Sequence, residues 1–330
     1  MSYILSVAVP SYNVEKYLDK ALTSYSDDRF RGRLDVMVIN DGSTDATAQI
    51  AAKYAEKYPD VIRLINKENG GHGSAVNCGI ENARGKYFRI IDGDDWVNTD
   101  NLAILLDKLE NEECDMVIDQ KREVNMETGE TCFFPLPEDT VFEKEIPFRE
   151  ICNKPEISPY IMLHTLSVKT ELLREHNIRI LEGIFYVDIE FIIKSTMEAK
   201  TIKFVDLEVY QYLVGNLNQS VNWRNYVKRF SHHSKVTREL IRYATEKQTD
   251  DENFRKYLDE RICLLINTHM NIALIFNKNR KEGKQQAKDF RKYLKNTNLK
   301  YYKKTEKRYI ITSVLHTLGV DFDKLQKIKK

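Results

Sequence analysis

The stretch Tyr87-Phe88-Arg89-Ile90-Ile91-Asp92-Gly93-Asp94-Asp95 joins a short apolar run to three carboxylates within four residues. The apolar half predicts a buried strand, and the half with glycine and aspartates predicts the turn where that strand leaves its sheet. Two carboxylates about 4 Å apart repel each other by about 4 kcal/mol at an effective dielectric near 20. The turn therefore favours a bound divalent cation, and ligands that are all oxygen indicate Mg²⁺ or Mn²⁺ rather than zinc. A solvated acidic turn is the alternative.

The same succession of apolar run, polar turn and helix occurs three times upstream. Strands are expected at residues 4–9, 35–40 and 61–65. Helices are expected after their turns, at residues 14–25, 46–58 and 74–83. Ser43 or Thr44 can cap the second of these helices, and Asp45 is expected to serve its N-terminus.

Strands that alternate with helices in this way form a parallel sheet covered on both faces, so the fold class is α/β. In such sheets ligands bind beyond the carboxyl ends of the strands. Each predicted strand here ends in polar or glycine-rich residues, at 11–13, 41–43, 69–71 and 92–95. Four loops are therefore expected to share one edge of the sheet, which favours the metal-site interpretation of the acidic turn.

The second half of the chain has a different pattern. A helix at 101–112 and a strand at 115–119 continue the α/β part, whereas helical patterns dominate from residue 225 onward. At 330 residues the chain is long enough for more than one region. We therefore expect an α/β domain over residues 1–222 and a helical region over residues 223–330.

The C-terminal part is strongly basic. Residues 278–330 contain 17 Lys or Arg and 5 Asp or Glu, a net charge of +12, whereas the whole chain sums to +1. A basic tail on an acidic body indicates an anionic partner, and we expect membrane lipid rather than nucleic acid. The apolar run at 310–315 predicts an interfacial helix, with a solvated basic face or burial of the run against the rest of the chain as the alternatives.

The cysteines and the hydropathy of the chain predict its cellular compartment. The five cysteines show no CxxC spacing and are odd in number, which indicates reduced thiols. No run reaches the roughly 18 to 20 apolar residues of a membrane span, and the N-terminus lacks the basic start of a secretion signal. We expect a cytoplasmic protein whose basic tail contacts the inner membrane face.

Four segments, in this order and spacing, resemble those of glycosyltransferase family 2, the inverting transferases of the GT-A fold that use nucleotide sugars. They read VAVPSYN at 7–13, VINDGSTD at 38–45, NGG through NCG at 69–79 and IDGDD at 91–95. The resemblance covers about the first hundred residues. It implies a Rossmann-like, mainly parallel sheet flanked by helices, with residues 1–222 as the catalytic domain and residues 223–330 as a helical region with an acceptor or membrane-proximal role.

The resemblance also implies which residues contact the nucleotide sugar. They are Pro10, Ser11, Tyr12, Asn13, Asp41, Gly71, Asn77, Arg84, Asp92, Gln219 and Ser220. Tyr12 would stack on the base, and Asp41 would accept a hydrogen bond from a ring N–H, which suits uracil. An Asx turn is the alternative role of Asp41. His72 is expected to form a wall of the pocket rather than to act in catalysis.

Metal and base are implied by two further matches. Asp92, Asp94 and Asp95 resemble the DxD motif of the family and are the expected metal ligands, with Asp94 or Asp95 as the direct one. Asp188 matches the family's base, which takes the proton of the acceptor hydroxyl. Val187 stands where relatives usually have Glu. The alternative for Asp188 is a carboxylate that only stabilises a helix N-terminus.

The resemblance therefore implies an inverting hexosyl- or N-acetylhexosaminyl-transferase. It would move a sugar from a UDP-sugar, with Mg²⁺ or Mn²⁺, to a hydroxyl of a cell-surface polysaccharide or lipid-linked glycan. A GDP- or dTDP-sugar donor is the alternative within the same fold. A nucleotide-binding partner without turnover in a glycan-assembly complex is the alternative from another class, against which the combination of the acidic cluster and Asp188 argues.

Overall fold

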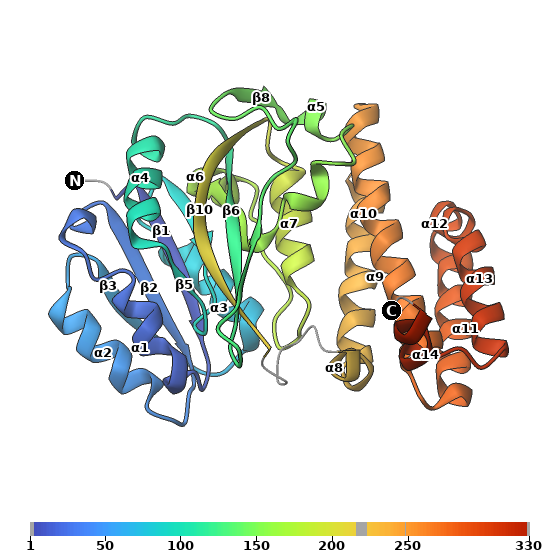
Figure 1. The fold of residues 1–330 in the computed structure, drawn as a ribbon. Helices are drawn as coiled ribbons and strands as arrows, with labels where there is room; N and C mark the ends of the chain where they lie inside the picture. Colours follow the sequence, from blue (N-terminus) through green and yellow to red (C-terminus); the bar gives the residue numbers. More distant parts are fainter. Residues whose placement is uncertain (1–2, 216–222, 248, 329–330) are drawn as a thin grey trace. The chain divides into compact units, whose positions relative to one another are not determined.

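The computed structural model describes residues 3–215, 223–247 and 249–328. The chain divides into two compact units, Met1–Asn216 and Leu217–Lys330. Figure 1 shows a sheet flanked by helices in the first unit and helices in the second. The predicted boundary between residues 222 and 223 falls at the edge of a segment outside the described residues, and it stays a prediction.

The described part of the first unit is built on one sheet of ten strands. The strands are Leu5–Ser11 (β1), Leu34–Asp41 (β2), Ile62–Lys67 (β3), Tyr87–Ile90 (β4), Trp96–Val97 (β5), Met116–Asn125 (β6), Thr131–Phe134 (β7), Glu145–Pro147 (β8), Leu166–Lys169 (β9) and Thr201–Val214 (β10). Their order is β3-β2-β1-β4-β9-β6-β10-β5, with β7 beside β6 and β8 beside β10.

The first four strands are parallel, as expected from the alternation of strands and helices. Every residue of β1 and β2 is buried, because helices cover both faces of a parallel sheet. Beyond β4 the sheet is mixed, since β9 pairs antiparallel with both β4 and β6 while β6 and β10 are parallel. The prediction of a parallel sheet therefore holds for its N-terminal half.

Seven helices flank this sheet in the described part of the first unit. They are Glu15–Thr23 (α1), Thr47–Lys57 (α2), Gly71–Asn82 (α3), Thr99–Glu110 (α4), Phe148–Ile151 (α5), Thr170–Glu175 (α6) and Asp188–Thr196 (α7). The predicted helices over the first 112 residues are all present, and α3 begins three residues earlier than expected.

At the start of α2 the predicted cap by Ser43 or Thr44 is wrong, whereas the predicted role of Asp45 is confirmed. Asp45 rather than Ser43 or Thr44 serves this helix end, because its Oδ1 accepts a hydrogen bond from the Thr47 N–H at 3.0 Å. Ser43 and Thr44 instead face the loop after β1, where they bond to Asn13: Ser43 Oγ accepts from the Asn13 N–H at 3.1 Å, and the Thr44 N–H donates to Asn13 Oδ1 at 2.9 Å. These bonds tie the loops after β1 and β2 together.

The described part of the second unit consists of helices. They are Trp223–Lys228 (α8), Phe230–Glu246 (α9), Glu252–Asn271 (α10), Arg280–Thr297 (α11), Leu299–Lys304 (α12), Glu306–Thr317 (α13) and Phe322–Ile328 (α14). A π-helical segment, Ile272–Phe276, continues α10. The predicted helical character of the C-terminal region is confirmed. Among the described residues, every helix is too short or too polar to cross a membrane.

Two histidines are buried side by side in this unit. The Nδ1 atoms of His233 on α9 and His269 on α10 are 3.2 Å apart, and their rings stack with centroids 5.2 Å apart. Phe230 and Phe290 pack against His269. Burial lowers the pKa of His233 to about 4 and that of His269 well below its usual value, to which the charge of Arg238 also contributes.

This pair predicts an acid-labile second unit. The unfolded chain takes up these protons near pH 6.5 and the folded unit does not, so the stabilisation present above that pH is lost as the pH falls toward 4. For His233 the full loss is on the order of 3 kcal/mol. The hydrogen-exchange protection factors of α9 and α10, which correct for the intrinsic exchange rate at each pH, should therefore fall from about pH 7 to about pH 5. His233→Phe should weaken the dependence of this protection on pH, and the neighbouring His232→Phe should retain it. The same pH dependence in the wild-type chain and in both variants would contradict the prediction.

Candidate active site

Three loops of the first unit meet where β1, β2 and β4 end at one edge of the sheet. The parallel register places Ser11 beside Asn40, so the loops after β1 and β2 start at the same level. Tyr12 follows β1, Asp41 ends β2 and Asp92 lies just after β4. The convergence that the alternation of strands and helices predicted is therefore present.

Asp41 fixes the glycine-rich loop at the start of α3. Its Oδ1 accepts hydrogen bonds from the Gly70 N–H at 2.9 Å and from Lys67 Nζ at 2.7 Å, and its Oδ2 accepts from the Gly71 N–H at 2.7 Å. The residue is only 3% exposed. Both oxygens thus have partners inside the protein, and a bond from Asp41 to a nucleobase stays a prediction.

The three aspartates of the acidic turn have different surroundings. Asp95 is buried, and its two oxygens accept hydrogen bonds from the Tyr210 hydroxyl at 2.6 Å and the Leu213 N–H at 2.7 Å. Asp95 therefore ties the turn to β10. Asp94 and Asp92 are less buried, and burial together with the Asp92 charge raises the pKa of Asp94 to about 6.

His72 lies between the acidic turn and the predicted base. Its Nε2 is 3.0 Å from Asp92 Oδ1, and its Nδ1 is 3.9 Å from Asp188 Oδ1. Burial by itself would lower the pKa of His72, but the hydrogen bond and charge of Asp92, with the charges of Asp188 and Asp94, raise it to about 9. His72 is thus hydrogen-bonded to Asp92, while its buried Nδ1 faces Asp188 without a hydrogen bond between them.

Asp188 is the first residue of α7, and its side chain is 53% exposed. Partial desolvation and the Asp92 charge raise its pKa, which brings a carboxylate base closer to neutral pH. Glu190, two residues on, does not join the site. It is buried, where it accepts a hydrogen bond from the Leu181 N–H at 3.1 Å and pairs with Lys194.

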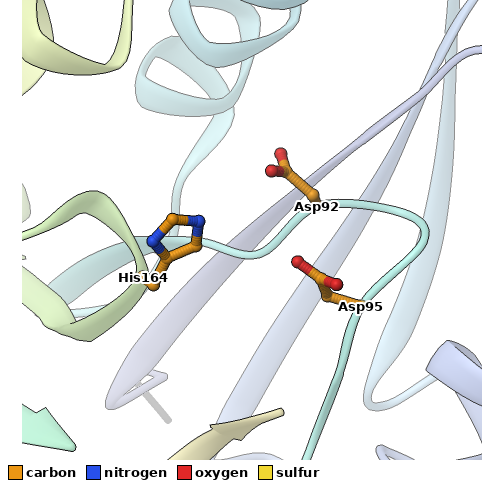
Figure 2. Close-up of side chains that lie close together, drawn as sticks. All are labelled: Asp92, Asp95 and His164. Carbon is orange, nitrogen blue, oxygen red and sulfur yellow. The ribbon is translucent and has the colours of Figure 1, made fainter. Parts of the chain in front are cut away.

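His164 is the residue of this site that sequence reasoning missed. It lies in a 3₁₀ turn, Leu163–Thr165, just before β9, and Figure 2 shows its ring facing the turn with Asp92 and Asp95. The ring packs against both Tyr210 and Tyr212. No motif surrounds it, and only the pairing of β9 with β4 brings it to the acidic turn.

Two observations indicate that these residues fit a divalent cation. One donor atom each from Asp92, Asp95 and His164 lie within 4.8 Å of one another. Burial lowers the pKa of His164 to about 4, so its imidazole is neutral and has a lone pair to offer. Carboxylate oxygens with one imidazole nitrogen suit Mn²⁺ better than Mg²⁺.

The glycine-rich loop packs against the chain's own segment that leads to Asp188. Gly71 has a φ of +79°, and a Cβ there would lie 3.3 Å from the backbone of Gly183. A Cβ at Gly73 would lie 2.0 Å from the Leu181 carbonyl oxygen. The absence of a Cβ at both glycines thus admits residues 181–183, and a contact of Gly71 with the nucleotide sugar stays a prediction.

Asn77 anchors the same segment from α3. Its Nδ2 donates to the Ile180 carbonyl at 2.9 Å and to Glu182 Oε1 at 2.8 Å, and its Oδ1 accepts from the Ile180 N–H at 3.0 Å. Asn77 is only 4% exposed, and both polar atoms of its amide are hydrogen-bonded. It therefore fixes residues 180–182, the segment that leads along the chain to Asp188.

The remaining predicted contacts divide into three groups. Tyr12 is 52% exposed beside Ser11 and Asn13 at the end of β1, where a base has access to its ring. Arg84 lies at the opposite edge of the sheet, because its N–H bonds to Ser6 near the start of β1, and we drop it from the site. The predicted contacts Gln219 and Ser220 lie outside the described residues.

Comparison with known proteins was made on sequence and on structure. Residues 6–163 match the family model described as "Glycosyl transferase family 2". Glycosyltransferase GlyA of Streptococcus pneumoniae is 33% identical over 140 residues, which are 42% of this chain and 20% of GlyA. The chain thus spans about a fifth of that relative.

Two solved structures share the fold. One is TarS 1-349 of S. aureus, crystallised with UDP-GlcNAc, with a TM-score of 0.67 at 19% identity. The alignment covers 97% of this chain and 93% of the TarS chain. The other is the mannosyltransferase PcManGT of Pyrobaculum calidifontis, solved with GDP-Man and Mn²⁺, with a TM-score of 0.55 at 17% identity. That alignment covers 98% of this chain and 88% of the PcManGT chain. The first unit therefore has the GT-A fold, with a helical C-terminal region. The match of residues 6–163 to glycosyl transferase family 2, a family of transferase enzymes, together with the fold and the relatives named as glycosyltransferases, supports a family 2 glycosyltransferase.

Proposed function

We propose that this chain moves a sugar from a UDP-sugar to a hydroxyl of a polysaccharide or lipid-linked glycan, with inversion at the anomeric carbon. One observation carries the proposal: the His72 ring lies 3.0 Å from Asp92 and 3.9 Å from Asp188. The acidic turn and the matched base thus share one site rather than two separate surfaces. A diphosphate at the turn would leave its sugar within reach of Asp188.

The chain's own groups supply most of this chemistry. Asp188 would accept the proton of the attacking hydroxyl, and His72, hydrogen-bonded to Asp92, would place its ring beside Asp188. The exposed Tyr12 ring would stack on the base, with Pro10, Ser11 and Asn13 around it. When bound by Asp92, Asp94 or Asp95 together with His164, Mg²⁺ or Mn²⁺ would neutralise charge on the departing diphosphate.

The proposed metal site predicts a nitrogen ligand. Mn²⁺ bound to the chain should show nitrogen coupling in pulsed electron paramagnetic resonance, because His164 faces the acidic turn. His164→Asn should remove that coupling and weaken Mn²⁺ binding about tenfold, the equivalent of about 1.4 kcal/mol. The surface histidine variant His176→Asn serves as the control and should keep both. Coupling that persists in His164→Asn would rule His164 out as a ligand.

Donor identity is tested with a panel of nucleotide sugars. We expect nucleotide release with UDP-sugars in the presence of Mn²⁺ or Mg²⁺, and its loss after chelation. The neighbour PcManGT was solved with GDP-Man, so release from GDP- or dTDP-sugars alone would favour the alternative donors. Measurable nucleotide binding without release from any donor would favour the non-catalytic partner in a glycan-assembly complex.

A further inference from the structure

Helix α13 presents an apolar face to the outside of the second unit. Ile310, Ile311, Val314 and Leu318 are 54%, 44%, 51% and 71% exposed. At about 100° per residue these four side chains project within an arc of about 100°. Single exposed apolar residues are ordinary on a protein surface, but a continuous helical stripe of four marks an interaction site.

The opposite side of α13 is the side that packs inward. Thr312 and His316 are buried there, and His316 Nδ1 bonds to the Leu274 carbonyl at 2.7 Å. The helix is thus already seated in its unit through that side. The exposed stripe is an additional apolar face that the fold of the described residues does not use.

Basic side chains lie beside the stripe, together with one exposed carboxylate, Glu306, in the first turn of α13. Lys303, Lys307 and Arg308 are exposed, and Lys307 falls within the same arc as the apolar residues. The long apolar stem of a lysine at position 307 would let its ammonium group stay in water while the neighbouring apolar side chains are buried. Residues 278–330 carry a net charge of +12, which complements an anionic surface.

A cationic cavity lies next to the C-terminal end of the stripe. It has a volume of about 330 Å³, and its lining includes Gly319, the residue that follows Leu318. Lys278, Arg280 and Lys324 also line it, with Asp321 as the one carboxylate among the lining residues. Lys278 pairs with Asp323 at 3.1 Å, Arg280 Nη2 donates to the His316 carbonyl, and Lys324 Nζ donates to the Gly319 carbonyl at 2.7 Å. A phosphate group in the cavity would share these three cations with their present partners.

We propose that the exposed face of α13 docks on a membrane that contains anionic lipid, with the stripe among the acyl chains and a lipid phosphate in the cavity beside it. Nucleic acid would use the basic residues but not the four apolar ones. A second copy of the chain would have to bring two basic faces together, which like-charge repulsion opposes. This docking is independent of the proposed transferase activity.

The test is flotation of the full chain with lipid vesicles. The wild-type chain should float with vesicles of phosphatidylglycerol and phosphatidylcholine in equal parts, not with phosphatidylcholine alone, and less at high salt. Val314→Asn/Leu318→Asn should lower partitioning about tenfold or more, because two inserted side chains are lost. Leu264→Asn, on α10 and 62% exposed, is the matched control and should bind like the wild type.

Two further flotation experiments separate the contribution of the basic side chains from that of the apolar stripe. Lys303→Gln/Lys307→Gln should lower partitioning by roughly tenfold or more, since each lysine near an anionic surface contributes about 1 kcal/mol. Excess inorganic phosphate at constant ionic strength should lower flotation only in part, because it competes with the lipid phosphate for the cavity but does not replace the inserted stripe. Circular dichroism of each variant establishes that it is folded.

Three results would overturn the docking proposal. The wild-type chain does not float with anionic vesicles, or the stripe variant and the Leu264→Asn control float equally. Alternatively, light scattering finds a wild-type dimer that Val314→Asn/Leu318→Asn splits while neither protein binds vesicles, which would make the stripe an interface between copies. Transferase assays do not enter this test, so its failure is separate from a failure of the proposed function.

Discussion

Asp188→Asn is expected to lower the rate of sugar transfer by about 10³-fold, the middle of the range that a positioned base contributes. The amide has nearly the same shape as the carboxylate but cannot take the proton of the acceptor hydroxyl. Binding of UDP should change by less than about twofold, because the substitution leaves the acidic turn and the nucleobase loop intact. The measurement is metal-dependent UDP release together with UDP affinity by calorimetry.

A matched control separates the base from a helix-terminus carboxylate. Asp100 lies in the first turn of α4 and its side chain is 81% exposed, so Asp100→Asn removes the same charge from a comparable position away from the site. It should leave transfer unchanged and lose at most about 1 kcal/mol of stability, because Asp100 lies at a helix N-terminus and pairs with Arg29 at 2.8 Å. Asp188→Asn should lose no stability, because the raised pKa of Asp188 means that folding disfavours its charge. Full activity in Asp188→Asn would exclude Asp188 as the base.

Arg89→Leu is expected to produce the largest loss of stability. Arg89 on β4 is fully buried, forms an ion pair with Asp119 that is equally buried, and donates from Nη2 to the His164 carbonyl at 2.6 Å. Removing the guanidinium leaves the Asp119 carboxylate buried without its counterion, at a cost of about 3–5 kcal/mol. Denaturant unfolding of the full chain measures this loss.

The double variant Arg89→Leu/Asp119→Leu is the control for this interpretation. Since it removes both charges, it should recover much of the stability that the single change loses. The His164 carbonyl keeps no arginine donor in either variant, so the difference between them reports the uncompensated charge. A double variant as unstable as Arg89→Leu would show that lost packing, not charge, dominates.

The order of elements in the first unit could be predicted because each signal is local. The apolar runs before Ser11, Asp41 and Asp92 end in residues that leave a sheet, and strands with intervening helices bring those ends to one edge. The placement of Asp188 near this edge followed from a resemblance alone. The structure supplies its neighbour His72, whose role depends on distances that sequence spacing does not contain.

The features that sequence reasoning missed depend on long-range packing. His164 reaches the acidic turn because β9 inserts antiparallel between β4 and β6, and no local pattern predicts that insertion. Asn77 looked like a ligand contact, yet its amide is used by residues 180–182, about a hundred positions away. Arg84 was misplaced because α3 returns the chain to the opposite edge of the sheet before β4 begins.

The choice between Asp94 and Asp95 illustrates the same limit. Adjacent aspartates in a turn look alike in sequence, and only the partners of their oxygens separate them. Asp95 is tied to Tyr210 and Leu213 while it also lies in reach of Asp92 and His164, so its first effect is to anchor the turn. Asp94 remains a candidate for the direct metal ligand.

The central claim is that one site combines a metal-assisted diphosphate leaving group with Asp188 as base. Its most direct test is UDP release from a UDP-sugar, measured side by side for the wild-type chain and Asp188→Asn, with Mn²⁺ and after chelation. We predict release by the wild-type chain with Mn²⁺, and almost none after chelation or in Asp188→Asn. Release that continues at the wild-type rate in Asp188→Asn, or that is indifferent to chelation, would contradict the claim.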